Sequence, residues 1–155
     1  MADKPVSVGD TAPDFTLKDN HGKEVTLRQQ RGTKVVLGFH PLAWTSVCAQ
    51  QMKDLEANFE RIKQAGGKAY GLSIDSTFCK KAWAEHLGIQ KTQLLSDFWP
   101  HGAVAADYGV FRSADGFSER AVFIVDSDGT VKFKKVYPTK DVPDIEEIIS
   151  ELENI

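Results

Sequence analysis

The sequence predicts an α/β fold in which helices flank a central mixed β-sheet and a β-hairpin lies at the N-terminal end. Two short apolar runs, residues 35–39 and 121–125, have the continuous hydrophobicity of strands that are buried on both faces of a sheet. Between these runs, apolar residues recur at helical spacing. A chain of 155 residues can bury a substantial core, and we expect residues 1–155 to form a single domain.

The elements are expected in the order hairpin, strand, helix, strand, helix, β-hairpin and helix, which is the thioredoxin-like arrangement. Turn signals at residues 19–22 and 126–129 join the strands of the two hairpins. Gly66 and Gly67 end the first helix, and Pro143 is expected in the first turn of the last one. The expected ranges are 15–17, 25–27, 33–40, 69–75, 94–95, 121–125 and 130–136 for strands, and 45–64, 77–87, 103–108 and from about 141 for helices.

The charge and the hydropathy pattern exclude several classes of partner. The formal net charge of −3 gives no support for binding to nucleic acid or to an anionic membrane. The sequence contains no apolar run of about 18 residues, the length that predicts a membrane span. Residues 1–10 carry Asp3, Lys4 and Asp10 and lack an apolar block, so we expect no secretory signal and a cytoplasmic location.

Cys48 is the first candidate for chemistry. It follows the buried strand and lies in the expected first turn of the next helix, beside unpaired backbone N–H groups and the positive end of the helix dipole. This environment favours the thiolate, which is the nucleophilic form of cysteine. Because Cys48 heads an apolar helical stripe that packs on the sheet, we expect its thiol to be half sheltered from solvent. The alternative to a reactive sulfur is a buried core cysteine with a packing role. The members of the stripe are Cys48, Met52, Leu55, Phe59 and Ile62.

The spacing Pro-x-x-x-Thr-x-x-Cys, formed by Pro41, Thr45 and Cys48, resembles the active-site motif of the peroxiredoxins, the AhpC/TSA family. The sequence of residues 41–48, 96–102 and 108–111 resembles that of the alkyl hydroperoxide reductase E subgroup. The resemblance implies a thioredoxin-like fold and a thiol peroxidase that reduces hydrogen peroxide and organic hydroperoxides. Cys48 would attack the O–O bond and become a sulfenic acid, with no metal or organic cofactor.

Three further residues receive roles from this resemblance. Thr45 would hydrogen-bond a peroxide oxygen, although threonine is also a common helix N-cap. Pro41 would shield the sulfur from water, and its alternative role is to end the strand. Arg120 begins the phrase Arg-x-x-Phe-Ile-Val-Asp and would stabilise the thiolate and polarise the peroxide. Arg112 is the weaker candidate for that role, because its neighbours are typical of a loop.

Gln51 departs from a frequent pattern of the family, in which glutamate stands three residues after the reactive cysteine. Glutamine can still hydrogen-bond an arginine, but it brings no charge. The orientation of Arg120 is therefore the part of the expected site that this departure affects.

Cys79 leaves the second half of the catalytic cycle open. A sulfenic acid must be reduced by a thiol, which is either Cys79, through an internal disulfide, or an external thiol. Bridging requires Cα atoms within about 7 Å of each other, and helices that follow successive strands can lie well apart, so some local unfolding would be needed. The alternative role of Cys79 is packing. External reductants would be thioredoxin, a glutaredoxin-like protein or a low-molecular-weight thiol.

Histidines and aromatic residues are the remaining side chains that could form a site. The four histidines show no metal-ligand spacing, so we expect no metal: they are His21, His40, His86 and His101. Four aromatic residues are concentrated in one region, and we expect most of them in the core: Phe78, Trp83, Phe98 and Trp99. The resemblance also implies a homodimer whose interface is formed by loops beside the active site, and this interface would cover part of that group.

Other functions compete with a peroxidase. A redox sensor or relay would pass the oxidation of Cys48 to a partner protein, and its first step is the same. A disulfide oxidoreductase of thioredoxin fold is disfavoured, because the chain has no Cys-x-x-Cys. A purely structural module would leave Cys48 with ordinary reactivity. Steady turnover of peroxide with a reductant would favour the enzyme over the relay.

Overall fold

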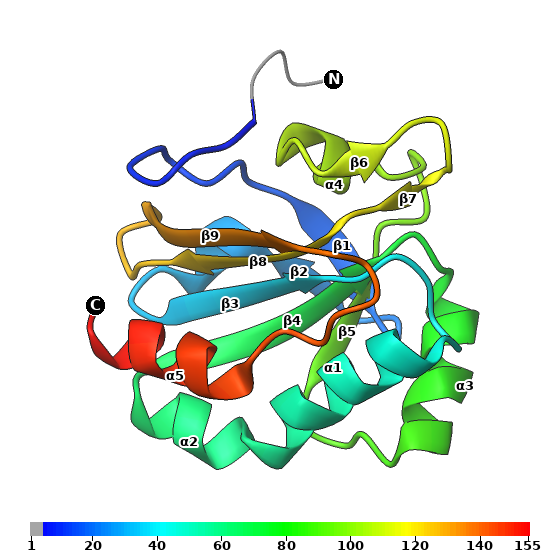
Figure 1. Ribbon diagram of the computed structural model, residues 1–155, viewed down its shortest axis with the longest axis horizontal. Coiled ribbons are helices and arrows are strands. Elements are labelled where there is room, and N and C mark those ends of the chain that lie inside the picture. Colours follow the sequence, from blue (N-terminus) through cyan, green and yellow to red (C-terminus); the bar gives the residue numbers. More distant parts are fainter. Residues whose placement is uncertain (1–4) are drawn as a thin grey trace.

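The computed structural model describes residues 5–155 and contains a seven-stranded mixed sheet with helices on both faces (Figure 1). The strands lie in the order β2-β1-β5-β4-β3-β8-β9, and β6 pairs with β7 in a separate two-stranded sheet. The strands are β1 (Thr16–Asp19), β2 (Glu24–Thr26), β3 (Lys34–Phe39), β4 (Gly67–Ser73), β5 (Gln93–Ser96), β6 (Phe111–Arg112), β7 (Phe117–Ser118), β8 (Arg120–Val125) and β9 (Val131–Tyr137). The helices are the 3₁₀ turn η1 (Leu27–Gln30), α1 (Ser46–Ala57), α2 (Phe59–Gln64), α3 (Thr77–Leu87), α4 (Ala103–Asp107) and α5 (Ile145–Glu153).

Both faces of the sheet are buried, which confirms the expectation from the continuous apolar strands. Side chains of β3 alternate between two cores, with Val35 and Leu37 on one face and Val36 on the other. The core that contains Val36 is covered by α1, α2, α3 and α5, and the other core is covered by α4 and the segment before β1 (Figure 1). Within residues 5–155, no helix is both long and apolar enough to span a bilayer. We expect no secretory signal in residues 1–10, and residues 1–4 of this segment lie outside the described part of the chain.

The register of the central strands brings two distant parts of the chain together. β3 pairs in parallel with β4 and antiparallel with β8. Phe39 at the end of β3 faces Ala121 near the start of β8. The residues that follow β3 therefore lie beside Arg120, the first residue of β8.

The long helix expected over residues 45–64 is broken into α1 and α2. Asn58 interrupts it with φ −106° and ψ 17°, outside helical geometry. Its side-chain Nδ2 donates to the carbonyl oxygen of Asp54 at 2.8 Å. Asparagine side chains compete with the backbone ladder in this way, so the apolar stripe continues across the break while the helix does not.

Two further details differ from the expected elements. The last helix begins at Ile145, after Asp144, whose Oδ1 accepts from the backbone N–H of Glu146 at 3.0 Å. Pro143 therefore precedes the N-cap instead of lying in the first turn. The small hairpin of β6 and β7 was not expected, because two residues per strand are too few for a visible alternation.

A pair of glycines lets α1 pack close to the sheet. Gly38 on β3 and Gly71 on β4 are partners in the register, and both lie beneath α1. A Cβ at Gly71 would clash with the sulfur of Met52, and a Cβ at Gly38 would lie 3.3 Å from Nε2 of Gln51. The absence of side chains at these two positions sets the height of α1 above the sheet.

We therefore expect Gly71→Ala to lower the free energy of unfolding by about 1–3 kcal/mol, the usual cost of overpacking a core. Gly38→Ala is the graded comparison, because its new methyl group meets the end of a polar side chain at 3.3 Å. Urea titration of both variants measures the difference. A Gly71→Ala protein as stable as the wild type would show that close approach of α1 is not required.

Candidate active site

Cys48 lies in the first turn of α1, as the sequence predicts, with Thr45 at the N-cap position. Its side chain is completely buried, at 0% exposure, and is part of the core under α1. The expectation of a half-sheltered thiol was therefore wrong. The loop between β3 and α1 contributes to this burial, because Pro41 and Ala43 in that loop are themselves buried.

Arg120 donates one hydrogen bond to the sulfur of Cys48, and its other hydrogen bonds fix its own orientation. Its Nη1 donates to Sγ of Cys48 at 3.3 Å and to Oε1 of Gln51 at 2.8 Å. Its Nε and Nη2 both donate to the carbonyl oxygen of Thr139, at 3.1 and 2.8 Å. Arg120 is 2% exposed, and the plane and direction of its donors are set by buried Cys48 and Gln51 and by the backbone carbonyl of Thr139, which is itself an exposed residue.

Thr139 was missed by sequence reasoning. It contributes a backbone carbonyl, which every residue possesses, and it follows β9 in the connection to α5. No side-chain pattern could have found it. Its two hydrogen bonds show that Arg120 is oriented from the side opposite Gln51, so the loss of a glutamate at position 51 does not leave the guanidinium free.

A cleft of about 250 Å³ opens beside the first turn of α1. Its walls come from the loop before α1, from the β6–β7 hairpin and from the start of β8; the lining residues are Pro41, Leu42, Thr45, Ser46, Val47, Arg112, Phe117, Arg120 and Thr139. The cleft therefore gathers the predicted Pro41, Thr45 and Arg120 around the first turn of α1. It has room for a small molecule next to Arg120 and Val47, the neighbours of Cys48 in space and in sequence, although Cys48 itself does not line it.

Thr45 is exposed to this cleft, and its hydroxyl does not cap α1. Its Oγ1 donates to the carbonyl oxygen of Leu42 at 2.8 Å, and no side-chain cap bond forms. Because the hydroxyl proton is used, the lone pairs of Oγ1 remain to accept from a donor in the cleft. The N-cap alternative is correct for position only.

Arg112 also lines the cleft but is engaged elsewhere. Its Nε lies 2.8 Å from a carboxylate oxygen of Asp115 and 3.7 Å from one of Glu119. Its guanidinium also lies over the ring of Phe117. Arg120 and not Arg112 therefore reaches the sulfur.

A family model described as the AhpC/TSA family matches residues 8–134. The chain belongs to this family.

Related AhpC/TSA proteins cover most of the chain. Alkyl hydroperoxide reductase E of Mycobacterium tuberculosis is 40% identical over 140 residues, which span 90% of this chain and 91% of the relative. A peroxiredoxin of Thermoplasma volcanium is 35% identical over 150 residues, or 94% of this chain and 72% of the relative. The crystal structure of Enterococcus faecalis AhpC superimposes with a TM-score of 0.87 at 26% identity, covering 95% of this chain and 90% of that one. The chain is thus a peroxiredoxin of thioredoxin-like fold and a thiol-dependent peroxidase.

Cys79, the second cysteine of this peroxiredoxin, lies near the start of α3 as a free, half-buried thiol. Its Sγ lies 3.8 Å from Oδ1 of Asp75. Desolvation and the negative charge of Asp75 raise the pKa of the Cys79 thiol. This thiol is therefore held in its protonated, less nucleophilic form.

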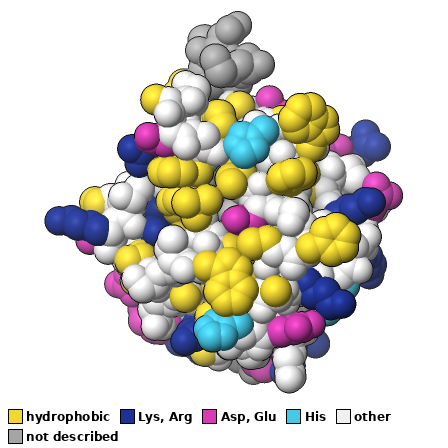
Figure 2. All heavy atoms as spheres, turned by 90° about the vertical axis from the view of Figure 1, so that its right-hand side faces the viewer, with side chains coloured by type: hydrophobic (Ala, Val, Ile, Leu, Met, Phe, Trp, Pro, Cys, Tyr) yellow, Lys and Arg dark blue, Asp and Glu magenta, His cyan; other side chains and the backbone are white. Residues whose placement is uncertain are grey.

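Most of the concentrated aromatic residues are on the surface, contrary to the expectation that they form the core. Trp83 is buried, but Phe78 and Trp99 are 83% and 81% exposed, and Phe98 is also exposed. Figure 2 shows hydrophobic side chains gathered on the face that carries α3. Phe78, Phe98 and Trp99 line a hollow of about 590 Å³ there.

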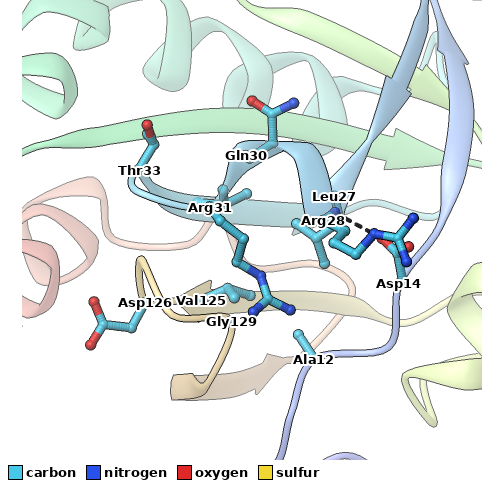
Figure 3. A pocket seen from close by; sticks show the side chains of 11 residues that line it. Ala12, Asp14, Leu27, Arg28, Gln30, Arg31, Thr33, Val125, Asp126 and Gly129 are labelled. Carbon is cyan, nitrogen blue, oxygen red and sulfur yellow. Dashed lines mark hydrogen bonds between the residues drawn. The ribbon is translucent and has the colours of Figure 1, made fainter.

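A second hollow, beside η1 and the β8–β9 turn, is too small to be a ligand site (Figure 3). Its volume is about 10 Å³, or roughly one water molecule. Arg31 reaches across it and donates to the carbonyl oxygen of Asp128 at 2.6 Å, against Gly129. Arg28 donates from its backbone N–H to Asp14 at 2.8 Å.

Among residues 5–155, no three potential metal ligands are grouped together.

A buried pair of basic residues, Lys80 and His40, lies at the end of β3 and was not predicted. Both side chains are at 0% exposure, and Nζ of Lys80 lies 3.0 Å from Nε2 of His40. Burial lowers the pKa of Lys80 to about 7. Burial, followed by the charge of Lys80, lowers the pKa of His40 well below its usual range.

This pair predicts a pH dependence of stability. Between pH 7 and about 10 the unfolded chain holds the Lys80 proton more tightly than the folded chain, so unfolding becomes harder as the pH rises. The slope is at most about 1.4 kcal/mol per pH unit. Urea titrations at pH 7, 8 and 9 should show this slope in the wild type and lose it in Lys80→Met. The exposed neighbour variant Lys81→Met should keep it, and equal slopes in all three proteins would contradict the assignment.

Proposed function

We propose that this peroxiredoxin reduces hydrogen peroxide and organic hydroperoxides at Cys48. The observation that carries the proposal is the shared donor of Arg120, whose Nη1 contacts both Cys48 and Gln51. A buried guanidinium aimed at a sulfur stabilises the thiolate, which is the nucleophile. The similarity to a protein named alkyl hydroperoxide reductase E supports the organic substrates.

The proposed reaction is an attack of the Cys48 thiolate on one oxygen of the O–O bond. The S–O bond forms as the O–O bond breaks, and sulfur loses two electrons to the leaving oxygen. That oxygen takes up a proton and leaves as water or an alcohol, while Cys48 becomes a sulfenic acid. Arg120 also donates toward the oxygen on which charge develops.

Thr45 and Pro41 would prepare the peroxide for this attack. The free lone pairs of Thr45 Oγ1 accept the O–H of the incoming peroxide, because the hydroxyl proton is already given to Leu42. Pro41 is buried against the site, lines the cleft and offers no backbone N–H to water. The two residues thus orient the substrate and keep solvent from the sulfur.

These roles predict the effects of two substitutions. Cys48→Ser should abolish peroxide consumption. Arg120→Lys, which keeps the charge but loses the fork of donors, should lower the second-order rate constant with hydrogen peroxide by about a hundredfold. Stopped-flow fluorescence under excess peroxide measures both. Arg61→Lys, an exposed substitution on α2, is the control, and full activity of Cys48→Ser would refute the assignment of Cys48.

We further propose that an external thiol reduces the sulfenic acid. The contact of Cys79 with Asp75 and its raised pKa favour this route over attack by Cys79, because both oppose formation of a Cys79 thiolate. Thioredoxin, a glutaredoxin-like protein or a low-molecular-weight thiol would serve as the reductant.

The intact mass of the reduced protein after one equivalent of hydrogen peroxide, without added thiol, distinguishes the two routes. An external reductant predicts a gain of one or more oxygen atoms on Cys48, and the same gain in Cys79→Ser. A loss of two hydrogens without a covalent dimer would instead establish a Cys48–Cys79 disulfide. An unchanged mass would contradict peroxide chemistry altogether.

We propose that the chain acts as a single domain and assembles as a homodimer. One sheet carries both cores, which supports the single domain. Exposed Phe78, Phe98 and Trp99 form an apolar hollow of interface character, and Trp44 on the loop before α1 is half exposed. We also propose a cytoplasmic location, because a cycle that restores the Cys48 thiol needs a steady supply of reduced thiols.

A further inference from the structure

The loop that precedes α1 covers the sulfur of Cys48. Its residues 41–45 lead from β3 to α1, and we refer to them as the cover. Pro41 and Ala43 of the cover are buried, and Ala43 belongs to the same core cluster as Cys48. Because Cys48 is 0% exposed, a reagent larger than a peroxide reaches the sulfur only after the cover moves away. The contacts that hold the cover therefore control access to Cys48.

Asp75 holds the cover by its backbone. Asp75 lies between β4 and α3, and its Oδ2 accepts from the backbone N–H of Ala43 at 2.9 Å. The same oxygen accepts from Oγ of Ser73 at 2.6 Å, which fixes the direction of the carboxylate. Loss of this acceptor would leave the N–H of a buried residue unpaired, which is costly. The hydrogen bond thus ties the middle of the cover to the end of β4.

Trp44 attaches the cover to α3 at a second point. Its ring lies 5.2 Å from the ring of His86, with 38° between the two planes, and His86 belongs to the last turn of α3. Aromatic pairs of this kind contribute more than the area they bury. The two contacts hold successive residues of the cover, Ala43 and Trp44, against the same neighbouring part of the fold.

The backbone of Trp44 is strained while these contacts hold. Its φ is 69°, and among residues 5–155 Trp44 is the only residue other than glycine with a positive φ. This left-handed region is unfavourable for a residue with a Cβ, and a bulky residue in it is an outlier. Ala43 before it and Thr45 after it are both hydrogen-bonded, so the strain cannot relax while the cover is closed.

We propose that Trp44 and Asp75 are positioning residues that together form a strained latch on the cover, and that this latch sets how readily an external thiol reaches oxidised Cys48. The inference rests on the proposed reduction by an external thiol. While the latch is closed, Pro41 and Thr45 stay at the cleft that admits the peroxide. When it opens, the strain at Trp44 is released and the sulfur becomes accessible to a larger reagent. The strain therefore favours the step that resets the enzyme.

The first test compares alanine with glycine at position 44 in a Cys79→Ser background, in which Cys48 is the only cysteine. The probe is dithiobis(nitrobenzoate), a bulky aromatic disulfide. The Cys48 thiolate displaces one coloured thiolate from it and forms a mixed disulfide, and absorbance follows the rate. Both substitutions remove the ring that stacks on His86, so any loss of a subunit contact is common to them.

Trp44→Ala should react with the probe about fivefold faster than the Cys79→Ser parent, because it keeps the strain and loses the stack. Trp44→Phe keeps a ring beside His86 and should restore the parental rate. Trp44→Gly should react about fivefold more slowly than Trp44→Ala, because glycine adopts the left-handed conformation without strain and stabilises the closed cover. Without stored strain, the flexibility of glycine would favour the open cover instead. Equal rates, or a faster Trp44→Gly, would overturn the proposal.

The second test concerns the hydrogen bond of Asp75. Asp75→Ala removes the acceptor of the Ala43 N–H and should raise the rate with the probe about tenfold. Asp75→Asn keeps an oxygen that can accept this bond, and its rate should stay within about threefold of the parent. Glu85→Ala, an exposed substitution on α3, is the control. A folded Asp75→Ala protein that reacts at the parental rate would refute the role of Asp75.

Two further measurements separate a latch from a general loosening of the fold. Trp44→Ala and Asp75→Ala should raise the rate with the probe and not the rate constant with hydrogen peroxide, and a parallel rise of both would overturn the assignment. Low concentrations of urea should accelerate the probe reaction only slightly, because opening of the cover exposes little surface. A urea dependence as steep as that of global unfolding would also overturn it.

Failure of the latch and failure of the proposed function give different results. The probe reacts with the reduced thiol, so its rates test the latch whether or not the protein consumes peroxide. If Cys48→Ser still consumed peroxide, the proposed function alone would be refuted.

Discussion

The fixed position of the Arg120 guanidinium is the constraint on which the active site depends. The carbonyl oxygen of Thr139 takes two of its hydrogen bonds, and Gln51 shares the remaining donor with the sulfur of Cys48. A cation held on both sides in a buried site cannot rearrange when charge moves during the reaction. Gln51 is neutral, and among residues 5–155 no carboxylate lies within ion-pair distance of Arg120, so in the proposed mechanism its charge remains available to the thiolate.

Arg120 and Cys48 are brought together by the pairing of two neighbouring strands. β3 and β8 are neighbours in the sheet, so the loop after β3 and the first residue of β8 meet without any long-range rearrangement of the chain. The glycine pair of β3 and β4 then allows α1 to settle low on the sheet, with Gln51 and Cys48 on its underside. Sheet register, helix height and side-chain direction are thus three separate conditions that are met at one place.

Much of the fold and the central residues of the site could be predicted from the sequence. Periodicity located the sheet strands and α3, and the spacing of Pro41, Thr45 and Cys48 identified the motif. The break at Asn58 could not be found, because a side-chain hydrogen bond overrides a periodic stripe only once the local geometry is known. The burial of Lys80 could not be found either, because lysine is normally exposed and its partner His40 is 40 positions away.

The exposed aromatic residues show a further limit of sequence reasoning. Phe78 and Trp99 have the hydrophobicity of core residues, and a single chain gives no way to separate burial within a subunit from burial between subunits. The carbonyl of Thr139 shows a second limit of sequence reasoning. Every residue type has a backbone carbonyl, so the amino acid at position 139 does not reveal that its carbonyl binds Arg120.

The complete burial of Cys48 separates the two halves of the catalytic cycle by the size of the reagent. A peroxide fits the cleft, and a slight shift of the cover over Cys48 would expose the sulfur to it, whereas a protein thiol needs a far larger opening. In the proposed cycle, the first turn of α1 then opens before an external thiol returns the oxidised sulfur to the thiol. The free energy of that opening therefore sets the lifetime of the sulfenic acid, and with it the choice between a scavenger that resets quickly and a store of oxidising equivalents that persists.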